Sequence, residues 1–174
     1  MHIRAVQETA AVHDRRIVNQ GTCHVSDRMQ DESVMDEEEN MKIAVIDGQG
    51  GGIGKAIIEK IKERCPEHEV IALGTNALAS SAMLRAGADS CATGENAICY
   101  NVGEVSLILG TMGILVPNAM LGELSPAMAA AIGAAKARKI LIPYQKCNVF
   151  VVGTDKGTLQ AQIEEMVEKI ISTV

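Results

Sequence analysis

Short apolar segments alternate with amphipathic ones from Met41 onward. The apolar run 42–47, bounded by glycine, predicts a buried strand, and isoleucines three and four positions apart predict a helix over residues 53–64. The pattern then predicts a strand at 69–73, a helix at 79–86, and a short strand and one helical turn within 88–101. The second half of the chain is predicted to form a strand at 105–109, a helix at 127–137 after Ser125 and Pro126, strands at 139–142 and 149–152, and a closing helix at 159–171. This alternation predicts a single Rossmann-like α/β domain of three layers around a mostly parallel sheet.

Residues 1–40 lack this periodicity and hold most of the net charge. They carry nine acidic side chains against four Lys and Arg, whereas residues 41–174 carry thirteen against twelve. A segment of this composition buries little apolar surface. We therefore expect residues 1–40 to be a disordered extension, or translation to start at Met41, and residues 41–174 to form the nucleotide-binding domain. The histidines at 2, 13 and 24 leave a metal-binding or partner-binding tail as the alternative.

The composition narrows the class of protein further. A chain of 174 residues, 47% of them hydrophobic, suits one domain with a proper core, and only 2% aromatic residues make that core aliphatic. The near-neutral body has no basic stripe, so we expect no nucleic-acid partner. Five cysteines without a CxxC pair argue against a disulfide framework or a structural zinc site, and they favour a cytoplasmic location. Because no apolar run is long enough to span a bilayer, we expect no membrane association.

A glycine-rich stretch is the strongest chemical feature of the chain. It follows the first predicted strand and leads into the first helix, with five glycines in seven residues. Glycine lets the backbone approach a ligand closely, and the N–H groups at a helix N-terminus attract anions. The stretch therefore predicts an anchor for a small phosphorylated ligand, with a tight turn as the alternative. The predicted binding residues are Gly48, Gln49, Gly50, Gly51, Gly52, Ile53, Gly54 and Lys55.

The spacing of these glycines does not identify one cofactor. The dinucleotide pattern G-x-G-x-x-G fails, because Ile53 stands at its last position. Gly48-x-x-x-Gly52-Ile53-Gly54 resembles the loop of short-chain dehydrogenases, but Asp47 replaces their usual Thr and no Tyr-x-x-x-Lys pair follows. A P-loop is also incomplete, since Ala56 replaces the magnesium-binding hydroxyl residue. NAD(P) or a nucleotide thus stays open as the cofactor, and no catalytic residue is assigned.

Other polar side chains follow the predicted strands, where ligands bind in open parallel sheets. Thr75 and Asn76 follow the second strand and suit a ribose or a 2′-phosphate, although the acid typical of NAD sites is absent there. The remaining predicted ligand contacts are Glu95, Asn96, Thr111 and Gly113, and residues 145–148 form a further polar loop. Asp47, Glu95 and Glu123 are the carboxylates expected near a common cleft. A divalent ion among them is an alternative, and we assign no metal site.

Several blocks of the body carry a family resemblance: IAVIDGQGGGIGKAI, AGADSCATGENAI, ILGTMGILVPNAMLGELSPAMA and KILIPYQKCNVFVVG. In this order they resemble an uncharacterised bacterial family, the domain of unknown function 3842, over about residues 41–171. The resemblance implies the fold and a bacterial cytoplasmic origin, but no reaction. Beside a ligand-binding protein, two alternatives stay open. One is an NAD(P)-dependent oxidoreductase or a transferase. The other is a homo-oligomeric metabolite sensor or scaffold, in which the small-residue helix 127–137 packs on a second copy.

Overall fold

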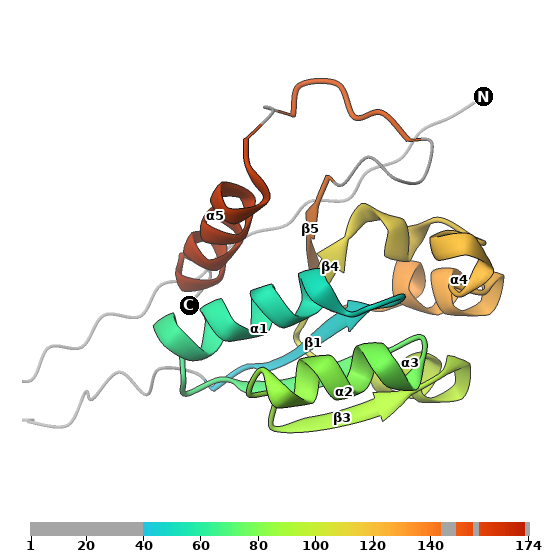
Figure 1. Ribbon diagram of the computed structural model, residues 1–174, viewed down its shortest axis with the longest axis horizontal. Helices are drawn as coiled ribbons and strands as arrows, with labels where there is room; N and C mark the ends of the chain where they lie inside the picture. Colours follow the sequence, from blue (N-terminus) through green and yellow to red (C-terminus); the bar gives the residue numbers. More distant parts are fainter. Residues whose placement is uncertain (1–39, 144–148, 155–156, 173–174) are drawn as a thin grey trace, which may run out of the picture. The chain divides into compact units, whose positions relative to one another are not determined.

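A five-stranded parallel sheet forms the centre of the described chain (Figure 1). The computed structural model describes residues 40–143, 149–154 and 157–172. The chain divides into two units, 1–35 and 36–174, and only the second contains described residues. The predicted extension, apart from Asn40, and the polar loop 145–148 therefore lie outside the described residues.

Strands and helices alternate along the described chain, as the sequence predicts up to the fifth strand. The strands are β1 (Lys42–Asp47), β2 (Glu69–Gly74), β3 (Ser90–Thr93), β4 (Leu107–Thr111) and β5 (Arg138–Ile142). The α-helices are α1 (Gly52–Arg64), α2 (Ala77–Arg85), α3 (Glu95–Asn101), α4 (Pro126–Ala134) and α5 (Leu159–Ile171), and two 3-10 turns are η1 (Met112–Leu115) and η2 (Met120–Gly122). None of the helices in the described ranges is long and apolar enough to cross a membrane.

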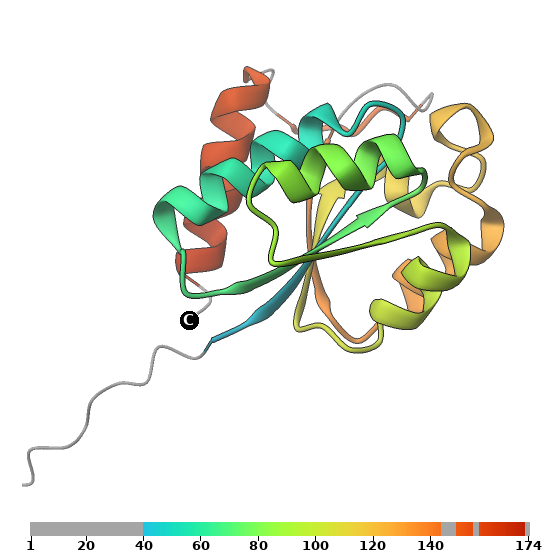
Figure 2. The same cartoon turned by 60° about the horizontal axis from the view of Figure 1, so that its bottom comes forward.

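Helices cover both faces of the sheet and make a three-layer α/β fold. On one face, α1, α2 and α5 pack their aliphatic side chains against β1, β2 and β4. Figure 2 shows α1 and α2 lying side by side across this face. On the other face, α3, α4 and η1 bury a second aliphatic cluster. Isoleucine dominates both clusters, which agrees with the shortage of aromatic residues.

The strand order β3-β2-β1-β4-β5 places a topological switch point between β1 and β4. The chain winds outward from β1 through β2 to β3, then crosses to β4 on the other side of β1. Because the two halves wind in opposite directions, the connections that leave β1 and β4 diverge at the carboxyl ends of the strands, which is where open α/β sheets bind ligands. Asp47 ends β1 at the level of Gly74 of β2, and Ile46 pairs with Gly110 of β4.

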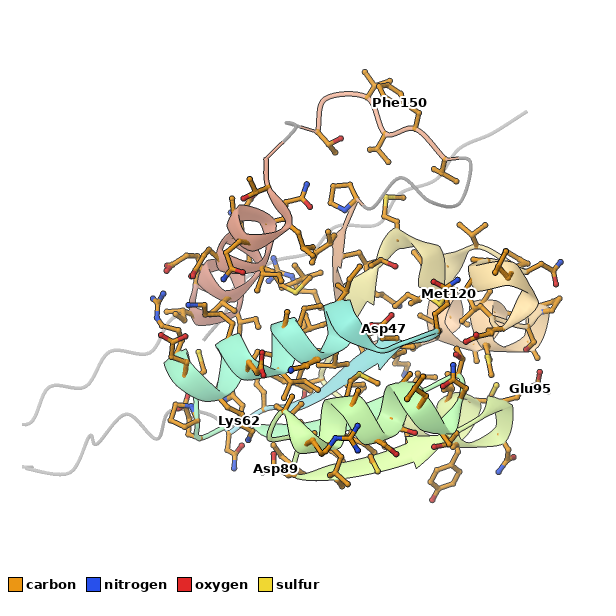
Figure 3. The ribbon with its side chains drawn as sticks, in the orientation of Figure 1. Asp47, Lys62, Asp89, Glu95, Met120 and Phe150 are labelled. Carbon is orange, nitrogen blue, oxygen red and sulfur yellow. The ribbon has the colours of Figure 1, made fainter. Side chains whose placement is uncertain are left out.

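Two sequence predictions about strands are wrong. The fourth strand spans Leu107–Thr111 rather than 105–109, so Gly110 and Thr111 lie inside the sheet and not in a loop. Residues 149–152 form no strand, and the side chain of Phe150 is 71% exposed on the connection between β5 and α5 (Figure 3).

We predict that residues 1–40 are dispensable for the fold. β1 begins at Lys42, and both aliphatic clusters, as far as the described residues form them, lie at or after Met41. Removal of residues 1–40 loses one described hydrogen bond, from Glu69 N–H to Asn40 Oδ1 at 3.3 Å, and this N–H also reaches Met41 O at 3.0 Å. A chain beginning at Met41 should melt within a few degrees of the full chain in circular dichroism. A drop above about 10 °C would contradict this prediction.

Candidate functional site

The glycine-rich loop Gly48–Gly51 joins β1 to α1 at the switch point. Asp47 and Met120 lie close together at this edge of the sheet, whereas Lys62 and Asp89 lie at the opposite edge (Figure 3). The carboxyl ends of β1, β2 and β4 therefore bring together the segments that the sequence predicts to bind a ligand.

Two residues of the loop adopt left-handed backbone conformations, Gln49 with φ 51° and Gly51 with φ 68°. The Gly51 N–H donates to Gly48 O at 2.9 Å, which closes the turn. A Cβ on Gly51 would lie 2.8 Å from Cα and O of Ala79, in the first turn of α2. Gly51 is thus required both by its φ and by the close approach of α2.

The buried carboxylate of Asp47 occupies the N-terminus of α1. Its Oδ1 accepts the Gly48 N–H at 2.8 Å, and its Oδ2 accepts the Gly54 N–H at 2.7 Å. The helix has no Ser, Thr, Asp or Asn at its N-cap position, which is Gly51, so Asp47 supplies the capping oxygen from the end of the strand. Burial raises the pKa of Asp47, although the N–H groups of Gly54, Gly48 and Ile53 act against this rise.

A second carboxylate, that of Glu123, also contacts the glycine-rich loop. Its Oε2 accepts three hydrogen bonds, from Thr75 Oγ1 at 2.6 Å, from Asn76 Nδ2 at 2.7 Å and from Gln49 N–H at 2.8 Å. The Thr75 hydroxyl, followed by the other two donors, lowers the pKa of Glu123. The end of β2 and the glycine-rich loop thus form a three-donor group around one anionic oxygen.

Residues 118–123, which we call the cover loop, lie directly over Gly48. A Cβ on Gly48 would lie 2.7 Å from Met120 Sδ and 3.0 Å from Glu123 Oε2. Three of its non-glycine residues have positive φ, Asn118 at 63°, Met120 at 57° and Leu121 at 61°, and the Leu121 side chain is 97% exposed. Strained backbone of this kind concentrates at ligand sites, where the surrounding structure holds it.

The other predicted ligand residues are more scattered. Lys55 lies in the first turn of α1, but its ammonium is exposed and 3.6 Å from Glu59 Oε1. Glu95 and Asn96 begin α3, and the Glu95 carboxylate accepts a hydrogen bond from Ser125. Thr111 is buried at the end of β4, and Gly113 is buried in η1. Of the predicted ligand residues beyond the loop, Thr75 and Asn76 are the two that the described hydrogen bonds connect to it. Both donate to Glu123, and Asn76 also donates to Gln49 O.

The sequence did not single out Met120, nor the internal roles of Asp47 and Glu123. An acidic residue shortly before a helix that lacks its own N-cap residue indicates a capping role. This signal could have identified the role of Asp47. No local signal marks Met120, which meets the glycine-rich loop only through the fold. Among the described residues, Asp47, Glu95 and Glu123 do not form a group of three metal-ligating side chains.

A cavity of about 400 Å³ lies away from the glycine-rich loop, between β5 and α5. Ile140, Gly153, Gln162 and Met166 are among its lining residues. At the loop itself, Met120, Thr75 and Glu123 fill the space next to Gly48. A ligand at the switch point therefore has to displace part of the cover loop or bind beside it.

One family model matches almost all of the described chain. It is described as "Domain of unknown function (DUF3842)" and matches residues 42–174, which include every strand and helix of the sheet domain. No curated protein matches the chain. The resemblance found in the sequence blocks is therefore confirmed, and the family description adds no activity to the geometry above.

Proposed function

This chain belongs to the DUF3842 family, and from that premise we propose that it binds a nucleotide, a dinucleotide or another small phosphorylated ligand at the carboxyl edge of its sheet. The glycine-rich loop anchors the ligand, and the cover loop closes over it. The proposal concerns binding, and it assigns no catalytic residue.

One observation carries this proposal: three donors from two separate parts of the chain converge on a single carboxylate oxygen. Gln49 N–H comes from the loop, and Thr75 and Asn76 follow β2. Such a group of donors binds a phosphate oxygen as well as a carboxylate oxygen, since both are anionic acceptors. We infer that Glu123 holds the position that a phosphate oxygen of the ligand takes.

The charges at the site favour a ligand phosphate that replaces the Glu123 carboxylate at the three donors over one that binds while Glu123 stays in place. Asp47 and Glu123 place two carboxyl groups beside the loop, and the ammonium of Lys55, in the first turn of α1, is engaged with Glu59. A phosphate that entered while Glu123 stayed in place would be repelled by it. When the cover loop opens, this negative charge leaves together with Met120, which frees the space over Gly48.

The approach to the loop is open on the side of α1. Ideal Cβ atoms on Gly50 and Gly52 meet nothing within 4 Å, and neither residue has a positive φ. Within the described residues, the N–H of neither residue makes an internal hydrogen bond, whereas Gly48, Gln49, Gly51 and Gly54 donate to acceptors of this chain. The N–H groups of Gly50 and Gly52 are therefore the loop donors best placed for a ligand.

The test substitutes Gly52 with Val, which adds bulk where the protein itself has space. The folded variant should melt near the wild type, because a Cβ at Gly52 meets no protein atom within 4 Å. Thermal unfolding is then measured with ATP, NAD⁺, NADP⁺ and inorganic phosphate. At least one of them should stabilise the wild type, by about 2.7 kcal/mol at a hundredfold excess over its Kd, and the variant should lose this gain.

Gly133→Val is the matched control, since a Cβ at Gly133 in α4 also meets nothing within 4 Å. It should keep the ligand-induced stabilisation, after allowance for its own effect on the helix. Mass spectrometry of small molecules released from the denatured wild type extends the search beyond the four probes. If no probe stabilises the protein and no phosphorylated molecule is released, or if Gly52→Val binds as the wild type does, the proposal is wrong.

A further inference from the structure

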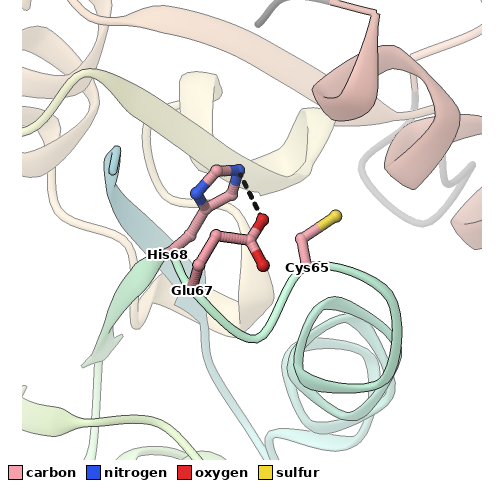
Figure 4. A group of neighbouring side chains, drawn as sticks. All are labelled: Cys65, Glu67 and His68. Carbon is pink, nitrogen blue, oxygen red and sulfur yellow. Dashed lines mark ion pairs between the residues drawn. The ribbon is translucent and has the colours of Figure 1, made fainter. Parts of the chain in front are cut away.

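The turn between α1 and β2 gathers a thiol, a carboxylate and an imidazole at the sheet edge opposite the glycine-rich loop (Figure 4). We propose that Cys65, Glu67 and His68 bind one divalent cation that prefers sulfur and nitrogen ligands, as Zn²⁺ does. This site is independent of the phosphorylated ligand proposed above. It also departs from the sequence prediction, which took the missing CxxC pairs as evidence against zinc.

The local backbone explains why three side chains of neighbouring residues converge. Cys65 is the C-cap of α1, and its N–H donates to Ile61 O at 2.7 Å. Pro66 follows, and the His68 N–H reaches back to Cys65 O at 3.4 Å, so that residues 65–68 form a tight turn. The turn places the first and last residues close together. One ligand atom from each of the three side chains lies within 4.8 Å of the other two.

Burial distinguishes this group from an ordinary surface cluster. Cys65 and His68 are each 2% exposed, whereas Glu67 is exposed. Among the described residues, His68 Nδ1 has no hydrogen-bond partner, and Nε2 lies 3.6 Å from Glu67 Oε1, beyond hydrogen-bond distance. The unpartnered Nδ1 carries a desolvation cost, and Nε2, the nitrogen that faces Glu67, is the one placed to bind a cation.

The separations suit tetrahedral coordination after a small contraction. Zinc bonds of about 2.0–2.1 Å to nitrogen and oxygen place two such ligands roughly 3.3 Å apart at a tetrahedral angle. The observed 3.6 Å between His68 Nε2 and Glu67 Oε1 is close to this value. Three protein ligands leave the fourth position to water, which reaches the site on the exposed side of Glu67.

The surrounding charges favour a cation at this place. Cys65 caps the C-terminus of α1, and this end of the helix carries partial negative charge. The two nearby basic side chains are paired with carboxylates: Lys62 Nζ lies 2.7 Å from Asp89 Oδ2 and also donates to His68 O at 2.8 Å, and Arg64 pairs with Glu168 at 2.8 Å. Binding releases the thiol proton to solvent. The thiolate and the carboxylate then carry one negative charge each, and together they balance the two positive charges of the divalent ion.

Cobalt(II) is the probe for this site, because a cobalt–thiolate bond gives a charge-transfer absorption band in the near ultraviolet. We expect the reduced full-length protein at pH 7.5 to bind one Co²⁺ per chain with such a band, and Zn²⁺ to abolish the band by displacement. Cys65→Ala should eliminate the band. Glu67→Gln and His68→Gln should each weaken Co²⁺ binding at least tenfold, and lower pH should weaken it in the wild type, since protons compete for the ligands.

Cys91→Ser is the matched control, because Cys91 is exposed in β3, away from the turn, and it should retain the band. Circular dichroism establishes that each variant folds. Glu67→Gln alters an exposed side chain, so it tests the site even if the two buried positions tolerate no change. No charge-transfer band in the wild type, or a band that survives Cys65→Ala or disappears with Cys23→Ser or Cys147→Ser, would overturn the proposal.

Discussion

Gly51→Ala should lower the free energy of unfolding by about 3 kcal/mol. An alanine at φ 68° costs about 1 kcal/mol in backbone strain. Its Cβ would also lie 2.8 Å from Cα and O of Ala79, and overpacking against atoms that cannot rotate away typically costs 1–3 kcal/mol. For a domain of this size the loss corresponds to a fall in Tm of about 10 °C.

Gly52→Ala, one residue further along, is the matched control. Its Cβ meets nothing within 4 Å, and Gly52 is the first residue of α1, where alanine has the better helix propensity. We expect its stability to equal that of the wild type or to exceed it by up to about 1 kcal/mol. Chemical denaturation of both variants measures the difference. Equal stabilities would show that α2 and the loop do not approach as closely as the Gly51–Ala79 distances require.

The helices and the central strands follow from local pattern. The closing helix was predicted over 159–171 and is found at Leu159–Ile171, because its apolar residues recur with helical spacing and Thr158 caps it. β1 was likewise predicted with its observed bounds, because Asp47 and Gly48 mark the end of a short apolar run. The alternation of these elements was sufficient to predict the layers.

Glycine explains the error at β4. The strand was predicted to end at residue 109, just before Gly110, yet Gly110 lies within β4, where glycine is uncommon. A Cβ on Gly110 would lie 2.6 Å from Ile46 O of the neighbouring β1, so the glycine is needed for close approach of two strands. That approach depends on which strand lies next to β4, and the sequence pattern does not specify the strand order.

The same limit applies to the site. The glycine-rich loop is a local motif, and its position between a strand and a helix was predicted. The hydrogen bond from Gln49 N–H to Glu123 joins residues 74 positions apart, and the bonds from Thr75 and Asn76 to Glu123 span 48 and 47. These contacts arise only when the chain crosses the switch point. Sequence alone thus predicted free donors at the loop, several of which the fold supplies with internal acceptors.

The bonds to Glu123 make the stability of the domain depend on pH. The pKa of Glu123 is lowered on folding, so its contribution is complete above the pKa of the unfolded chain, about 4.3, and disappears as the pH falls through the lower pKa of the folded state. Glu123→Gln should therefore be less stable than the wild type by about 1 kcal/mol at pH 7, where a charged acceptor is replaced by a neutral one. The difference should shrink toward zero as the pH falls below 4.

Glu123→Gln should have the opposite effect on ligand binding, and this combination tests whether Glu123 occupies the ligand's place. The amide removes a negative charge from the three donors, so a phosphate displaces it more readily than it displaces the carboxylate. Whichever of ATP, NAD⁺, NADP⁺ or inorganic phosphate stabilises the wild type should bind the variant about tenfold more tightly in isothermal titration. Glu104→Gln, at an exposed site in the turn after α3, should change neither stability nor affinity. If Glu123→Gln binds the same probe more weakly, then Glu123 contacts the ligand directly, and the exchange inferred for it is wrong even though the loop still binds.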